Sequence, residues 1–183
     1  MKQIIILSFT LLFLLGYTNS QVTKGNWLVG GSGRFASQLE HLNGSEVKGL
    51  NIQVSTNLGY FPLDKFAGGL KAGYASDKIR YNSTETKISD FRVGPFLRYY
   101  FLNPEGRVNI LGESSYQYVH DQGLGNANLF SFSAGPVIYF NSSIGLELTL
   151  NYELYREAET NTKANTLFFG IGLQVHLEKD RNY

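Results

Sequence analysis

Charged side chains recur inside segments that are otherwise apolar at every second residue, and they are the first candidates for chemistry in this sequence. They carry both signs and occupy the alternate positions, between the apolar ones. Charges of both signs in one interior would pair with one another, because a buried charge without a partner is costly. Alternatively, they could line a path for solutes. The predicted interior charges are Lys71, Asp90, Arg92, Arg98, Glu113, Glu147 and Glu153.

Catalytic and metal-binding chemistry has little support in the residue types. The sequence has no cysteine and three histidines, none with a neighbour at metal-ligand spacing. A hydrolase that acts on lipid would need a serine, a histidine and an orienting acid within reach of one another. His120 with Ser114, Ser115 and Asp121 offers these types, but serine and aspartate are common near loops. We therefore expect no catalytic residue, no cofactor and no metal site.

The elements that must position the charges are strands. From Leu167 to Leu177 every second residue is apolar, and mostly small or polar residues fill the places between. Period two puts successive side chains on opposite faces of a strand. Segments of about ten residues are long enough to cross a bilayer as strands of a closed barrel. Eight segments fit this pattern: 26–37, 48–58, 65–75, 88–101, 108–118, 129–140, 144–154 and 167–177.

The connections between these segments alternate in length. Such alternation is typical of a barrel whose two ends lie in the periplasm, with long outer loops and short inner turns. Aromatic residues gather near both ends of the segments, as two interfacial girdles would. Two Gly-Pro pairs, 94–95 and 135–136, predict a bulge or a broken ladder, because proline lacks an N–H donor. The predicted long loops are 38–47, 76–87, 119–128 and 155–165, and the short turns are 59–64, 102–107 and 141–142.

The first twenty residues have the layout of a secretory signal peptide. Lys2 gives a positive start, 4–15 is almost entirely apolar, and small or polar residues precede Gln21. The apolar run is shorter than the roughly 20 residues that a membrane-spanning helix needs. We expect 1–20 to be removed, leaving 21–183 as one barrel domain. The net charge of +1 does not suggest a nucleic-acid partner.

Residues 93–101, which read Val-Gly-Pro-Phe-Leu-Arg-Tyr-Tyr-Phe, resemble a segment of small bacterial outer-membrane β-barrel domains of the OmpX and OmpA barrel type. Residues 134–152 resemble the same family, and the eight-segment pattern extends the resemblance over the whole predicted domain. The resemblance implies a C-terminal signal for the barrel-assembly machinery, with Gly172, Val175 and Leu177 at its positions. Gly170 departs from this signal, because a polar residue is usual there.

Together these patterns predict an all-β fold: an eight-stranded antiparallel up-and-down transmembrane β-barrel in a Gram-negative outer membrane. Such a barrel is just wide enough to be filled by its own side chains, so we expect the interior charges to form a structural plug. The expected role is a rigid barrel that presents its outer loops to outer-membrane lipid or to an unknown extracellular or envelope partner. The alternatives are a small pore, a lipid-acting barrel enzyme and a soluble ligand-binding barrel that resembles a lipocalin.

Overall fold

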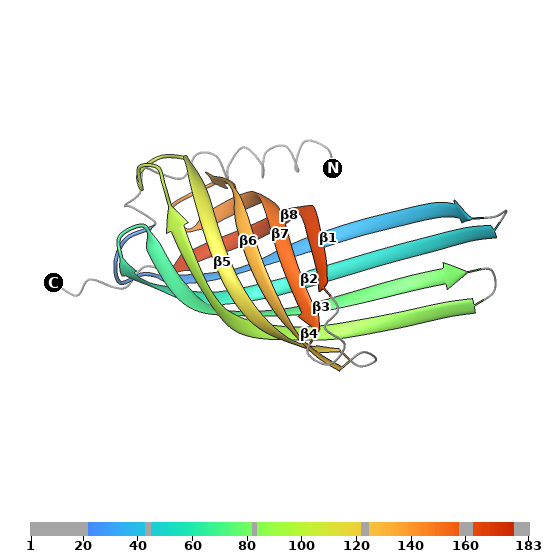
Figure 1. Ribbon diagram of the computed structural model, residues 1–183. Helices are drawn as coiled ribbons and strands as arrows, with labels where there is room; N and C mark the ends of the chain where they lie inside the picture. The colour runs from blue at the N-terminus through green and yellow to red at the C-terminus, as the bar shows by residue number, and fades with distance from the viewer. Residues whose placement is uncertain (1–21, 43–44, 82–83, 122–124, 158–162, 178–183) are drawn as a thin grey trace, which may run out of the picture.

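The computed structural model describes residues 22–42, 45–81, 84–121, 125–157 and 163–177. The predicted signal peptide, 1–20, lies outside these residues. Within them the chain forms one closed antiparallel barrel in which each strand pairs with its sequence neighbours and the last pairs with the first (Figure 1). The predicted all-β, eight-stranded up-and-down barrel is therefore confirmed. The strands are β1 Trp27–Leu42, β2 Ser45–Leu63, β3 Phe66–Tyr81, β4 Thr84–Tyr100, β5 Val108–Asp121, β6 Gly125–Tyr139, β7 Ile144–Glu157 and β8 Lys163–Leu177.

The strands are longer than predicted, so most of each predicted long loop is strand. The pairing of β1 with β2 continues to Leu42↔Ser45, and that of β3 with β4 to Tyr81↔Thr84. These four strands project beyond the rest of the barrel (Figure 1). The prediction ended them too early because the apolar alternation of the sequence stops there, whereas backbone pairing continues. No described helix is long and apolar enough to cross a bilayer.

The two ends of the barrel differ in their connections. At one end short turns join β2 to β3, β4 to β5 and β6 to β7, and we call this the turn end. Lys65 in the first of these turns has a positive φ of 65°. The segment before β1 is fastened there too, since Lys65 N donates to Val22 O at 2.7 Å and Lys24 N to Asp64 Oδ1 at 2.8 Å. The opposite end carries the long pairs of strands and is called the hairpin end.

The prolines of β4 and β6 interrupt the ladder without shifting the register. On one side Pro95 stays in register with Leu70 of β3, but Gly94 and Pro95 lack partners in β5. Gly135 and Pro136 likewise lack partners in β7 while pairing with β5. Pairs on both sides of each gap keep one register, so the predicted broken ladder is confirmed and neither site is a bulge.

The glycines before these prolines lie against the backbone of the next strand. A Cβ atom on Gly94 would overlap the carbonyl oxygen of Tyr116 in β5, and one on Gly135 would overlap that of Leu148 in β7. Only glycine therefore lets the two strands approach so closely where the ladder is interrupted.

β1 and β8 close the barrel over a short ladder that we call the seam. Its register pairs run from Trp27↔Leu177 to Gly33↔Ile171, which confirms that the last strand pairs with the first. Above Gly33 the two strands no longer pair within the described residues. There the guanidinium carbon of Arg34 lies 4.2 Å from the centre of the Phe168 ring. A cation–π contact between these two side chains thus joins β1 to β8 beyond the end of their backbone pairing.

Large apolar side chains cover the outside of the barrel. Phe169 exposes 82% of its surface, Phe35 71% and Leu167 63%. Buried polar and charged side chains alternate with such residues along the strands, including Arg98 and Glu147. The polarity of the barrel is therefore the reverse of that of a soluble barrel, which buries apolar groups and exposes polar ones.

Replacing Gly94 by alanine tests the close approach of β4 to β5. We expect Gly94→Ala to lower the free energy of unfolding by about 1–3 kcal/mol, because the added methyl group forces the strands apart. The measurement is urea unfolding of the protein refolded in detergent micelles, followed by the fluorescence of Trp27. Gly33→Ala is the matched control, since its Cβ would meet one atom at an ordinary 3.9 Å. Equal losses in both variants would contradict the packing argument.

Candidate functional site: the barrel lumen

Four charged side chains form a cluster across the lumen, which we call the central charge cluster: Lys71, Arg98, Glu113 and Glu147. Arg98 is paired in register with Glu113, and its Nη2 donates to Glu113 Oε2 at 2.6 Å. Its Nη1 donates to Glu147 Oε1, also at 2.6 Å, and Lys71 Nζ donates to Glu113 Oε1 at 2.6 Å. Gln174 Nε2 donates to Glu147 Oε2 at 3.0 Å. Two cations thus balance two carboxylates within hydrogen-bonding distance.

A layer of apolar and aromatic side chains closes the lumen at the turn end, and we call it the apolar floor. Phe61, Tyr100 and Tyr139 lie around the His176 ring, with ring centroids 5.7, 6.1 and 5.8 Å from it, respectively. Arg98 Nη1 donates to the Tyr100 hydroxyl at 3.2 Å, which joins the floor to the central charge cluster. The floor consists of Val22, Leu28, Phe61, Ala67, Phe96, Tyr100, Leu111, Val137 and Tyr139.

A second group of charges lies nearer the hairpin end and is called the upper charge group: Asp90, Arg92 and Glu153. Arg92 Nε donates to Asp90 Oδ1 at 2.5 Å, and its Nη2 donates to Asp90 Oδ2 at 3.1 Å. Its Nη1 lies 3.5 Å from Glu153 Oε2, while Gln53 Nε2 donates to Glu153 Oε1 at 3.3 Å. This group therefore links β4 with β7 and β2 across the lumen.

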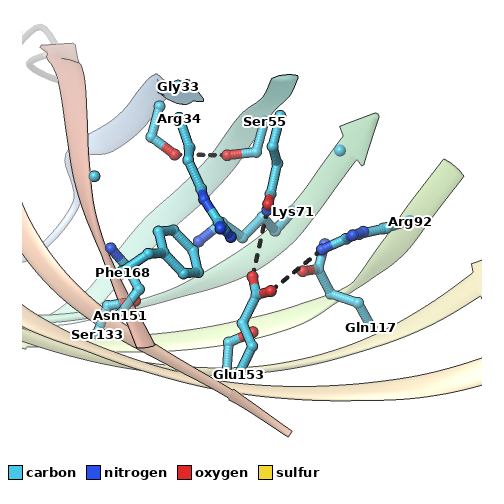
Figure 2. Close-up of a pocket in the computed structure, with 15 residues that line it drawn as sticks. Gly33, Arg34, Ser55, Lys71, Arg92, Gln117, Ser133, Asn151, Glu153 and Phe168 are labelled. Carbon is cyan, nitrogen blue, oxygen red and sulfur yellow. Dashed lines mark hydrogen bonds and ion pairs between the residues drawn. The ribbon is translucent and has the colours of Figure 1, made fainter. Parts of the chain in front are cut away.

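A small polar cavity of about 30 Å³ lies among these side chains (Figure 2). Arg34, Lys71 and Arg92 reach it from three different strands, and Glu153 faces them. The volume is enough for about two water molecules, since one needs roughly 10–15 Å³ by this kind of measure. The central charge cluster and then the apolar floor lie between this cavity and the turn end.

All seven predicted interior charges face the lumen, four in the central charge cluster and three in the upper charge group. The structure also places Arg34 there, which the sequence reasoning missed. Arg34 occupies the alternate position next to outward-facing Phe35, so the period-two pattern already held this signal. Tyr100 and Gln174 were missed as hydrogen-bond partners of the charges.

The candidate hydrolase residues do not assemble. His120 Nδ1 is 3.0 Å from Asn126 Oδ1 at the hairpin end. Ser114 precedes it on the same strand by roughly 20 Å, at about 3.3 Å per residue, and Ser115 is buried on the opposite face. The side chain of Asp121 lies outside the described residues. No cluster of described histidine and acidic side chains could hold a metal ion.

The three residues of the predicted assembly signal lie in the seam. Gly172, Val175 and Leu177 pair with Ser32, Val29 and Trp27 of β1 in that order. A Cβ atom on Gly172 would lie 3.1 Å from the Gly31 carbonyl oxygen and 3.3 Å from Glu147 Oε2. Packing alone therefore favours glycine at this position. Recognition of the segment by the assembly machinery stays a prediction.

Known structures share this architecture, although no protein-family model and no curated protein sequence matches the chain. The outer membrane protein OprG from Pseudomonas aeruginosa has a TM-score of 0.57 and 13% identity, covering 88% of this chain and 100% of that chain. The N-terminal β-barrel domain of Pseudomonas aeruginosa OprF has a TM-score of 0.49 and 14% identity, covering 84% and 98%. Neisserial surface protein A has a TM-score of 0.47 and 13% identity, covering 85% and 98%.

At these identities the likeness concerns the fold. Of these three structures OprG has the highest TM-score, and its alignment covers 88% of this chain. The resemblance to small outer-membrane barrels is therefore confirmed at the level of the fold, and the chain folds as a closed eight-stranded barrel like that of OprG.

Proposed function

We propose that the chain is an integral outer-membrane β-barrel protein with a structural or surface-interaction role. The observation that carries this proposal is the reversed polarity of the barrel. Arg98 and Glu113, whose side chains are each 3% exposed, form an ion pair inside, while Phe169 exposes 82% of its surface outside. Such an exterior is stable in hydrocarbon, and a closed barrel has no open sheet edge there.

Aromatic side chains on the outer face support this placement. Near the turn end, Tyr99 and Phe101 stack edge to face with centroids 5.1 Å apart. Near the hairpin end, the Tyr116 and Phe130 rings lie 4.8 Å apart, and Tyr116 Oη donates to Asn128 Oδ1 at 2.6 Å. Aromatic rings with a polar tip are favoured where hydrocarbon meets headgroups.

The filled lumen favours a structural role over a pore. Both charge groups and the apolar floor occupy the space inside the strands, and the remaining cavity of about 30 Å³ takes only a few water molecules. The β1–β2 and β3–β4 hairpins project from the hairpin end and offer an extended surface to a partner (Figure 1). The separation of His120 from Ser114 gives no support to a lipid-acting enzyme.

The membrane location is tested by extraction. We expect the protein to stay in washed outer membranes at high salt and alkaline pH and to be released by detergent, because its exposed apolar belt binds lipid chains. Immunoblotting of the soluble and pelleted fractions measures this. Release without detergent would disprove the proposal.

Leu148→Arg tests which face meets the lipid. Leu148 exposes 41% of its surface in the middle of β7. Arginine at the bilayer midplane costs roughly 2–4 kcal/mol, and near an interface about 0–1 kcal/mol. We expect Leu148→Arg to lower the free energy of unfolding in lipid vesicles by the larger amount, as measured by urea titration. Ser76→Arg, on the outer face next to the aromatic band, is the matched control and should lose far less. Equal effects would contradict the assigned face.

Arg98→Met tests the plug. It leaves Glu113 and Glu147 close together without the cation that both contact, so we expect a loss of about 3–5 kcal/mol in unfolding free energy. The matched control Arg107→Met removes an exposed arginine that has no ion-pair partner among the described residues, and it should change little. In planar bilayers we expect the unmodified protein to show no stable unitary conductance. A stable conductance that changes with Arg98→Met would establish the pore instead.

A further inference from the structure

Positive charge is concentrated on the outer face of the barrel at the hairpin end. Five cations occupy outward positions there. On β3, β4 and β7 they lie on the same strand faces as Tyr74, Phe91 and Tyr152, which are nearer the turn end. Among the residues whose side chains the structure describes, Glu85 supplies the one outward carboxylate at this level. We call these cations the cationic rim: Lys78, Arg80 and Lys87 on β3 and β4, and Arg156 and Lys163 on β7 and β8.

The rim contains like charges placed directly opposite one another. Lys78 is paired in register with Lys87, and Arg156 with Lys163. Like charges at directly opposite positions of neighbouring strands are destabilising. Glu85 offsets part of the first pair, since its carboxylate lies 2.7 Å from Lys78 Nζ. No carboxylate in the described part of the chain lies within ion-pair distance of the second pair.

Glu85 is committed to its neighbours. Its Oε2 accepts a hydrogen bond from Arg80 Nη2 at 2.6 Å, and its Oε1 pairs with Lys78. The hydrogen bonds from Lys78 and then Arg80 lower the pKa of Glu85, so it is ionised at neutral pH. One ionised carboxylate among five cations leaves the rim strongly positive.

The position of the rim along the strands matches one leaflet. On the outer face of β3, Leu70 is followed by Tyr74, whose hydroxyl donates to Ser89 Oγ at 3.0 Å, and then by Lys78. From Phe66 to Lys78 the strand runs roughly 40 Å at about 3.3 Å per residue. A strand tilt of about 40° reduces this to roughly 30 Å along the membrane normal, the thickness of the hydrocarbon core. Lys78 therefore lies at headgroup level when Phe66 marks the opposite interface.

The turn end has a smaller excess. Its partly or fully exposed charged residues in the described part of the chain are three cations and two acids: Lys24, Lys65, Arg107, Asp64 and Glu105. The charges that the structure describes are thus distributed asymmetrically along the barrel axis, with the larger positive excess at the hairpin end.

We propose that the cationic rim binds the phosphate groups of lipid headgroups in the outer leaflet. This inference rests on the membrane location proposed above. Arginine presents a planar set of donors that matches phosphate oxygens, and lysine contributes a compact charge on a flexible chain. The bound phosphates neutralise Lys78 against Lys87 and Arg156 against Lys163. The repulsion within these two pairs therefore lowers stability only in a membrane without such headgroups.

The test compares two vesicle compositions, phosphatidylcholine alone and phosphatidylcholine containing phosphatidic acid, with the full mature chain. Spin-labelled lipid measures the preference of the protein surface for phosphatidic acid over phosphatidylcholine. We expect this preference to fall about fivefold for each rim cation removed and to weaken with salt. The variants are Lys78→Gln with Lys87→Gln, and Arg156→Gln with Lys163→Gln. Lys24→Gln with Arg107→Gln, at the turn end, is the matched control and should keep the preference.

A sign reversal in stability gives a second readout. In phosphatidylcholine, Arg156→Gln should raise the urea midpoint because it removes a repulsion. In phosphatidic acid vesicles it should lower the midpoint because it removes a phosphate contact. The same sign in both vesicles, or an unchanged lipid preference in the rim variants, would overturn the proposal. The preference for phosphatidic acid should persist when inorganic phosphate is added at a matched concentration. Its loss would also overturn the proposal and would indicate a site for the free ion instead.

Vesicle flotation separates this proposal from the membrane location. If the unmodified protein does not float with either vesicle, the membrane location is wrong and the rim falls with it. If the protein floats but shows no preference for phosphatidic acid, the barrel is in the membrane and only the binding proposal is wrong.

Discussion

Closure of the backbone hydrogen bonds into a ring is the constraint on which the rest of this structure depends. Eight strands fix a lumen that is just wide enough for the side chains of its own wall. Because side chains alternate between the two faces, every charge at an inward position is enclosed with the others. Such charges cannot turn to bulk water, so they must be neutralised inside. In the described part of the chain, the central charge cluster and the upper charge group neutralise seven such charges.

Arg98 also acts as a mechanical link. Its guanidinium contacts Glu113 on the neighbouring strand β5 and Glu147 on β7, which is not a neighbour of β4. A contact between non-adjacent strands joins opposite parts of the wall through the lumen, where no backbone bond can. The hydroxyl of Tyr100 extends this link to the apolar floor. Charge neutralisation and bracing of the wall are therefore served by the same side chain.

Much of this architecture could be predicted from period-two alternation, and the misses have physical causes. The alternation assigned the charged residues to the inward face because a charged side chain is unfavourable on a face that meets hydrocarbon. Arg98 and Glu113 could be expected to meet across a tight turn, but contact with Glu147 depends on the diameter of the closed barrel. The strand residues within 38–47 and 76–87 were missed because the sequence has no apolar alternation there, while the backbone ladder continues. Contact of Arg34 with Phe168 could not be predicted, because Phe168 comes from the far end of the chain.

The seam joins the most distant parts of the chain through a short ladder, from Trp27↔Leu177 to Gly33↔Ile171. All other neighbouring strands are linked by local connections, so they can pair as hairpins at little entropic cost. Bringing the two outermost strands together gains few backbone bonds for the longest loop that must be closed. We therefore expect the sheet to assemble as an open, curved ribbon whose two edges meet last. The unequal lengths of the ladders therefore predict the order in which the strands pair.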